Sequence, residues 1–198
     1  GVVEAQDKEP GGNQVSYIGC DRRGLPHAHR GRIKSTEEES AGNAYCGSVE
    51  SGIVFEAHMY SKSAKYYDDI YASAGKDYPA EANKVRKFIK KYKQSDGNRL
   101  LDIGCGTGLH ANLLSKYYQV EGLDIEQKML SVARKNYPEI RFKQGDMVNF
   151  KLKSKFDIIV CLFSAIGHVK TKSRLQSAIK NMALHLLPGG VLLVEPWF

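Results

Sequence analysis

The chain has 198 residues, of which 42% are hydrophobic and 26% are charged, and its net charge is +7. This length favours one domain with additional material, and no apolar run approaches the roughly 18 residues that cross a bilayer. The first residues also lack the basic and then apolar pattern of a signal peptide. The four cysteines lie far apart and form no Cys-x-x-Cys pair. We therefore expect a reducing, cytoplasmic location without a disulfide framework or a membrane partner.

The charge is distributed unevenly along the chain. Residues 1–58 carry a net charge of −3, whereas residues 59–198 carry +10. A basic surface attracts anions such as nucleic acid, phosphates or a nucleotide-linked substrate. On charge alone, a solvated basic surface without a specific partner is the favoured explanation.

The composition changes near residue 58 and divides the chain in two. Residues 1–58 are rich in Gly, Ser, Glu and Asn, which predicts an irregular N-terminal segment or linker. Short strands are expected there only at residues 14–18 and 52–56. Residues 59–198 form the predicted domain.

Helix and strand signals alternate after residue 59. Asp77 and Pro79 are suited to the start of one helix, as its cap and within its first turn. This alternation predicts an α/β fold with a doubly wound, mostly parallel sheet. The fifth strand is followed almost at once by Phe198, so we expect a domain truncated after that strand, with a bare sheet edge unless another segment covers it. The expected helices are 61–71, 77–92, 109–117, 127–136 and 172–187, and the expected strands are 99–103, 119–123, 140–144, 157–163 and 191–195.

A glycine-rich loop follows the first strand of this domain. A phosphate-binding P-loop would need a Gly-Lys-Ser/Thr sequence, which is absent, and a dinucleotide site would place its third glycine one residue later. The pattern D-x-G-x-G-x-G is that of the S-adenosylmethionine (SAM) loop of class I methyltransferases. Glycines let the backbone approach a ligand closely. The loop reads Leu101-Asp102-Ile103-Gly104-Cys105-Gly106-Thr107-Gly108, and Asp102, Gly104, Cys105 and Gly106 are its candidate cofactor residues.

Two acidic residues follow the next two strands. Asp124 lies 20 residues after Gly104, where a carboxylate can accept both ribose hydroxyls of an adenosine, and the neighbouring Ile125 is assigned to the same site. Asp146 can accept the amino group of adenine, while Met147 can contact the ring face. By itself, each acidic residue is equally explained as a helix cap or a turn residue.

Several stretches resemble the desosamine and mycaminose N,N-dimethyltransferases, a class I family that acts on TDP-linked 3-amino-deoxysugars. The resemblance runs almost without gaps from Met59 to Phe198. It implies the class I SAM-methyltransferase (Rossmann-like) fold, SAM as the cofactor and transfer of methyl groups to a sugar amine. The stretches that carry it are Met59-Tyr60-Ser61, Tyr67-Asp68, Gly75-Lys76-Asp77-Tyr78, LLDIGCGTG, Val120-Glu121-Gly122-Leu123, Gly145-Asp146-Met147, the segment from Cys161 to His168 and Val194-Glu195-Pro196-Trp197.

The resemblance also implies roles for single residues. Tyr67 and Tyr78 would line the methionine end of SAM, and Cys161 would belong to the cofactor site. Asp124 replaces the glutamate that the family carries at the ribose. The residues implied at the sugar amine are Tyr60 and His168 as catalytic groups, with Glu81 and His168 facing the substrate.

Other functions remain as alternatives. The sequence after the fourth strand lacks the Asn/Asp-Pro-Pro-Tyr type of loop, which disfavours base methylation, so nucleic acid is not the expected partner. Methylation of RNA, protein or another small molecule, or SAM binding without catalysis, stays open, as does a homodimer. An NAD-dependent oxidoreductase is disfavoured by the glycine spacing. Cys20, His27, His29 and Cys46 match no familiar zinc finger, so no metal is expected.

Overall fold

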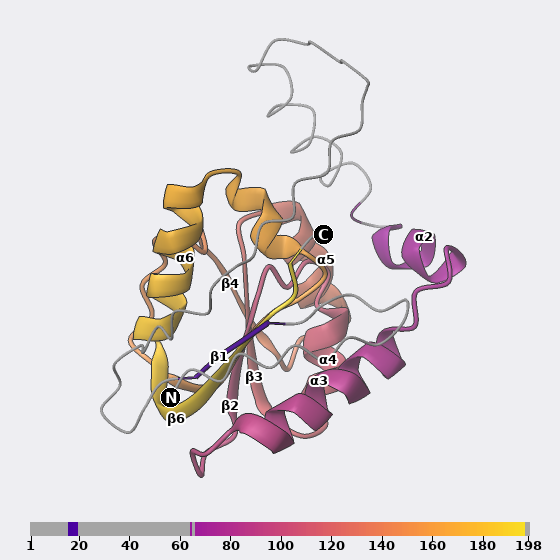
Figure 1. The fold of residues 1–198 in the computed structure, drawn as a ribbon. Coiled ribbons are helices and arrows are strands. Elements are labelled where there is room, and N and C mark those ends of the chain that lie inside the picture. The colour runs from indigo at the N-terminus through magenta and orange to yellow at the C-terminus, as the bar shows by residue number, and fades with distance from the viewer. Residues whose placement is uncertain (1–15, 20–63, 65, 197–198) are drawn as a thin grey trace, which may run out of the picture.

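The computed structural model describes residues 16–19, 64 and 66–196. Their strands form one sheet in the order β1-β6-β5-β2-β3-β4, in which β2 to β6 pair in parallel and β1 pairs antiparallel with β6 (Figure 1). The predicted doubly wound, mostly parallel α/β sheet is therefore confirmed. The strands are β1 (Ser16–Gly19), β2 (Arg99–Ile103), β3 (Gln119–Asp124), β4 (Arg141–Gln144), β5 (Phe156–Cys161) and β6 (Leu186–Val194), and the helices are α2 (Tyr67–Ser73), α3 (Tyr78–Tyr92), α4 (Leu109–Ser115), α5 (Gln127–Asn136), α6 (Lys172–Leu184) and the 3-10 helix η1 (Ala165–Val169).

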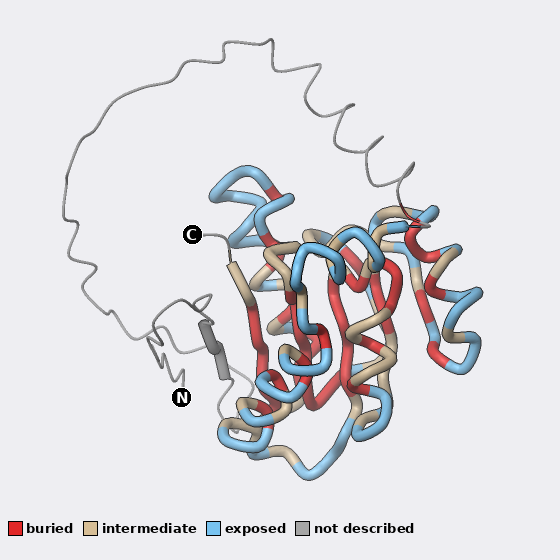
Figure 2. Tube along the Cα trace, turned by 90° about the vertical axis from the view of Figure 1, so that its right-hand side faces the viewer, coloured by how far each residue is buried: buried red, intermediate tan, exposed pale blue. Residues whose placement is uncertain are grey.

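Helices cover both faces of the sheet. Along the buried strands, side chains alternate between two hydrophobic clusters because successive residues of a strand point to opposite faces. Leu100 and Ile158 pack with α3 and α4, whereas Leu101 and Ile159 pack with α6. Figure 1 shows α3 and α6 on opposite sides of the strands, and Figure 2 shows that most of the buried chain lies in the strands between them.

The start of α3 follows the sequence signals. The Asp77 side chain accepts a hydrogen bond from the backbone N–H of Ala80 at 2.9 Å, and Pro79 lies in the first turn. The helix then buries Val85 and Ile89 against the sheet. The predicted cap and the apolar spacing of this helix are therefore confirmed.

The strand order places a crevice beside the glycine loop. From β2 the chain moves outward through β3 and β4, and it then returns to add β5 and β6 on the other side of β2. Connections leave β2 and β5 in opposite directions at such a switch point, and the crevice outside the carboxyl ends of the two strands is where open α/β sheets bind ligands. The strand order thus predicts a ligand-binding crevice next to Gly104.

Several boundaries differ from the prediction, most clearly at the last strand and the first helix. The last strand begins at Leu186 rather than at residue 191, and the predicted turn at Pro188, Gly189 and Gly190 lies within it. The Gly189 carbonyl accepts the N–H groups of Gln94 and Ser95 at 2.8 and 2.9 Å. The loop after α3 therefore supplies the hydrogen bonds of this irregular part of the strand. The helix expected at 61–71 is observed at Tyr67–Ser73, and residues 64 and 66 form turns; residues 61–63 and 65 lie outside the described part of the chain.

The edge of the sheet next to β6 carries an additional strand. Ser16 pairs with Val194 and Gly19 with Val191, so the strand that was predicted at 14–18 and is observed at 16–19 covers the edge that would otherwise be bare, and the described sheet has six strands. The strand expected at 52–56 lies outside the described residues. Among the residues that the structure does describe, no helix is long and apolar enough to cross a membrane.

Candidate active site

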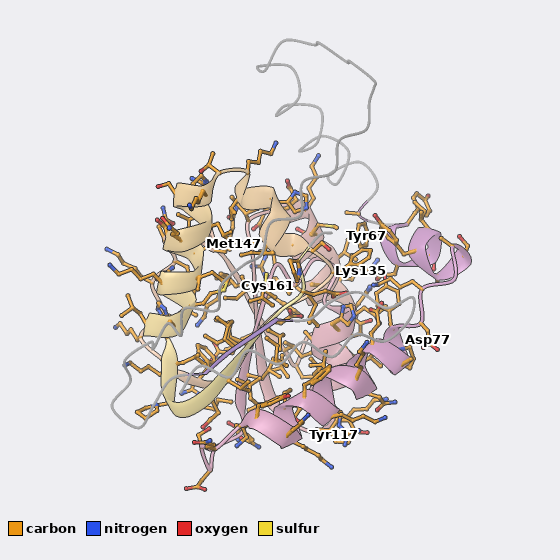
Figure 3. All side chains as sticks on the ribbon, in the orientation of Figure 1. Tyr67, Asp77, Tyr117, Lys135, Met147 and Cys161 are labelled. Carbon is orange, nitrogen blue, oxygen red and sulfur yellow. The ribbon has the colours of Figure 1, made fainter. Side chains whose placement is uncertain are left out.

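A pocket of about 340 Å³ opens at the carboxyl ends of the parallel strands. Its size is within the usual range of small-molecule sites. In the view of Figure 3, Tyr67 on α2 and Met147 after β4 lie on either side of Cys161, at the end of β5. The lining comprises Tyr67, Ile103, Gly104, Gly106, Leu123, Asp124, Ile125, Glu126, Met129, Gly145, Asp146, Met147, Leu162, Phe163, Ala165, His168, Val169 and Arg174.

The glycine loop forms part of the pocket wall. Gly104 has a φ of +72°, and a Cβ on it would lie 2.5 Å from the Cβ of Ala165. The Gly104 and Cys105 N–H groups donate to the Leu123 carbonyl at 2.8 and 3.1 Å, which fixes the loop over the end of β3. Only glycine can combine this backbone conformation with such a close approach.

Asp124 ends β3 with its carboxylate at the pocket. One oxygen accepts the N–H of Gly106 and the other accepts the N–H of Glu126, both at 2.8 Å. Burial raises the pKa of Asp124, and these backbone hydrogen bonds oppose that rise. A carboxylate oxygen can accept more than one hydrogen bond, so this oriented side chain can still receive a pair of ligand hydroxyls.

Another part of the pocket lining combines apolar surface with a second carboxylate. Ile125 is 63% exposed although it is a large apolar side chain, and it lines the pocket together with Met147. One Asp146 oxygen accepts the Val148 N–H at 2.9 Å, and the other accepts a guanidinium N–H of Arg174 at 2.8 Å. This end suits a flat, partly apolar ring that has a donor on its edge.

The predicted cofactor residues thus fall into two groups. The pocket brings together Tyr67, Gly104, Gly106, Asp124, Ile125, Asp146 and Met147. Tyr78, Asp102, Cys105 and Cys161 lie near the same end of the sheet but do not line the pocket.

The buried residues of the second group differ in chemistry. Burial raises the pKa of Asp102 to about 6, and its Oδ2 and the Tyr78 hydroxyl have no hydrogen-bond partner among the described residues. Burial also raises the pKa of the Cys105 and Cys161 thiols, which therefore stay neutral. No group of metal-ligating side chains occurs in the described ranges, and the four weak zinc candidates, at positions 20, 27, 29 and 46, lie outside them.

Glu81 does not line the pocket, and its expected place facing the substrate stays a prediction. Its carboxylate contacts the Lys76 ammonium at 2.7 Å and Nε2 of His110 at 2.9 Å. Lys76 also lies 3.5 Å from the ring centroid of Phe163, which lines the pocket. Burial alone would raise the pKa of Glu81, but the hydrogen bonds with His110 and Lys76 lower it. The structure thus places Glu81 in a network that supports the wall.

Replacing Glu81 with glutamine is expected to lower the melting temperature near pH 7 by roughly 2–4 °C, because the network loses its charge-assisted hydrogen bonds. A carboxylate with a lowered pKa stabilises the fold above its ordinary pKa of 4.5 and loses that effect as the pH falls further. The deficit of Glu81→Gln should therefore narrow below about pH 4.5 in thermal scans. Glu139→Gln, at an exposed position, is the control, and a deficit that is constant with pH would contradict this role.

His168 lies on the pocket wall within η1. Three non-glycine residues around it, Phe163, Ser164 and Lys170, have φ values of +51°, +58° and +61°. The Phe163 N–H donates to Oε2 of Glu195 at 2.7 Å, which helps to hold this conformation. Unfavourable backbone conformations of this kind cluster at functional sites. Tyr60, the other predicted catalytic residue, lies outside the described residues.

Phe163 and Arg174 are pocket residues that the sequence did not reveal. Phe163 was predicted to be the last residue of a strand, although β5 ends two residues earlier, at Cys161. Arg174 reaches the pocket from the first turn of α6 and pairs with a residue 28 positions away. No local sequence signal marks such a contact.

The residues present fit a bound S-adenosyl compound. The close-packed glycine loop allows backbone approach, Asp124 offers acceptors for a ribose, and Ile125 and Met147 offer apolar surface for a purine.

The comparisons with known proteins agree with this fit. A family model described as a methyltransferase domain matches residues 100–190. A dTDP-3-amino-3,4,6-trideoxy-alpha-D-glucopyranose N,N-dimethyltransferase of Streptomyces venezuelae is 40% identical over 68% of this chain and 57% of its own length. A dTDP-3-amino-3,6-dideoxy-alpha-D-glucopyranose N,N-dimethyltransferase of Streptomyces fradiae is 36% identical over 72% of this chain and 56% of its own.

A solved methyltransferase structure is also similar to this chain in fold and sequence. SAM-bound CalS10, an amino pentose methyltransferase from Micromonospora echinaspora, superimposes with a TM-score of 0.64 at 40% identity, covering 67% of this chain and 56% of that protein. The chain thus spans a little over half the length of these relatives. The chain therefore has the fold of the class I SAM-dependent methyltransferases and is similar in sequence to these N,N-dimethyltransferases.

Proposed function

We propose that the protein transfers methyl groups from SAM to the amine of a nucleotide-linked amino sugar. The observation that carries the proposal is one pocket that joins Asp124 and the glycine loop to a wall containing His168. The names of the relatives support the choice of substrate, because both curated relatives act on dTDP-linked 3-amino sugars. The net charge of +10 on residues 59–198 is consistent with an anionic nucleotide substrate.

When bound, SAM supplies a methyl group activated by a cationic sulfur. Asp124 would hold the ribose, Ile125 and Met147 would contact the adenine, and His168 would accept a hydrogen bond from the substrate amine. The amine attacks with its own lone pair, so correct placement can supply about 7–11 kcal/mol of the barrier reduction. His168 would orient the amine and help to remove its proton, which typically adds about 10²–10⁴-fold.

The type of partner, the oligomeric state and the location are finer assignments that belong to the same proposal. We propose a small-molecule partner rather than RNA, while a homodimer and a cytoplasmic location stay predictions. Two described cysteines, Cys105 and Cys161, are free and buried, which is consistent with a reducing compartment.

The test is methyl transfer from SAM to a dTDP-linked 3-amino sugar, followed by mass spectrometry of the sugar. We expect added methyl groups with the wild-type chain and turnover about 10²-fold lower with His168→Ala, because orientation by the rest of the pocket survives. The affinity for S-adenosylhomocysteine (SAH) and the melting temperature should remain close to wild type in that variant.

Three results would contradict parts of the proposal. A loss of turnover to background in a folded, SAH-binding His168→Ala chain would rule out orientation as the main effect. Methylation of RNA but not of the sugar would contradict the substrate class. Stoichiometric SAH binding without transfer to any amine would favour a non-catalytic SAM-binding domain.

A further inference from the structure

The ion pair between Asp146 and Arg174 lies at the mouth of the pocket. A guanidinium N–H of Arg174 donates to Oδ2 of Asp146 at 2.8 Å, and the two side chains are 50% and 24% exposed. Both residues line the pocket, and Arg174 is the only arginine or lysine among the described residues that do so. An ion pair as exposed as this contributes little to stability. Its place suggests a role in holding the carboxylate in position.

The segment after β4 is tied to α6 in a second way. The Asn181 side-chain amide donates to the carbonyls of Met147 and Phe150 at 3.4 and 3.1 Å. These bonds hold the backbone of the segment, whereas Arg174 holds only the Asp146 side chain. Removing the guanidinium therefore leaves the segment anchored and changes mainly the freedom of one carboxylate.

The fixed carboxylate has a definite chemical preference. One oxygen of Asp146 accepts the Val148 N–H and the other accepts Arg174, so the side chain is held from two sides. An ionised carboxylate only accepts hydrogen bonds. It can receive the 6-amino group of adenine, whereas the 6-oxo group of hypoxanthine would direct an oxygen lone pair against it. A pinned carboxylate cannot turn away to relieve that repulsion.

We propose that Arg174 is a positioning residue that determines the purine specificity of the pocket, by holding Asp146 where it accepts the 6-amino group of adenine. This inference rests on the proposed use of an S-adenosyl cofactor. Arg174 itself provides no catalytic group. It acts through Asp146, and its planar, permanently charged guanidinium group is suited to holding a carboxylate in one orientation.

The test compares two ligands on the full chain by calorimetry. SAH carries adenine, and S-inosylhomocysteine is the same molecule with hypoxanthine. We expect the wild-type chain to prefer SAH by roughly 10–100-fold, as for a site that is built to receive an N–H donor. Arg174→Ala should reduce that preference at least about fivefold, mainly through weaker SAH binding, and Arg174→Lys should restore only part of it. Lys172→Ala, an exposed position in the same helical turn, is the control for lost positive charge.

The possible outcomes distinguish a failure of the proposed cofactor from a failure of the proposed role of Arg174. A wild-type chain that binds neither ligand contradicts the proposed cofactor itself. If the wild type binds SAH but Arg174→Ala keeps the wild-type preference, the proposed role of Arg174 is wrong. An equal loss of affinity for both ligands would also overturn it, because it would show that Arg174 only closes the pocket. A collapsed preference with an unchanged melting temperature supports it.

Discussion

The Asp124→Ala variant is expected to bind SAH at least about 100-fold more weakly than the wild-type chain. Two ribose hydroxyls would lose their acceptors, and each hydrogen bond to a charged group contributes about 1.5–3 kcal/mol. The same change leaves the Gly106 and Glu126 N–H groups without the oxygens that accept them now, so the glycine loop also loses its anchor. Isothermal titration calorimetry measures the effect directly.

Two further variants separate ligand binding from stability. Asp124→Asn keeps the shape of the side chain but removes its charge, and we expect an intermediate loss of roughly tenfold. Glu121→Ala removes a carboxylate from the same strand, where it pairs with Arg99 and Lys143 and does not line the pocket. It should change stability without changing the affinity for SAH. Wild-type affinity in a folded Asp124→Ala chain would disprove the assignment of this residue.

Replacing Gly104 with alanine should both destabilise the fold and damage the pocket. The added methyl group would lie 2.5 Å from the Cβ of Ala165, at a residue whose φ is +72°. The unfavourable backbone and the collision together should cost roughly 2–5 kcal/mol. Because Ala165 begins η1, which carries His168, relief of the collision should displace the part of the pocket wall that contains His168. Chemical denaturation and SAH titration should both report the change.

Gly75 provides a matched control for this substitution. Its φ is +88°, and a Cβ there would meet no atom within 4 Å. Gly75→Ala should therefore cost only the backbone strain, about 1–2 kcal/mol, and should leave SAH binding intact. If the two alanine variants are equally stable and bind SAH equally, the close contact with Ala165 does not shape the pocket.

The regular elements could be predicted where local pattern and tertiary packing agree. The strand at 99–103 and the helix at 127–136 have the predicted limits, because the strand carries three buried aliphatic side chains and the helix has one apolar face. The start of β6 could not be predicted. Pro188 and the two glycines after it are a strong turn signal, yet contacts of Gly189 with residues 94 and 95 accommodate them within the strand.

The candidate site likewise contains residues that could be predicted from the sequence and residues that could not. Asp124 and Asp146 could be found because the end of a parallel strand is a local feature, and the sheet brings such ends together. Arg174 and Phe163 could not, since their places depend on how α6 and η1 return over the pocket. The pairing of Glu81 with Lys76 and His110 could not be predicted either, while its expected place at the substrate stays a prediction. A single sequence does not reveal which groups a charged side chain will pair with in the folded protein.

The most direct test of the central claim is a calorimetric titration of the wild-type chain with SAH. We expect one molecule to bind per chain with a dissociation constant in the micromolar range, roughly −8 kcal/mol. Adenosine, which lacks the amino-acid end, should bind more weakly. No detectable SAH binding by a chain that circular dichroism shows to be folded would contradict the assignment of this pocket to the cofactor.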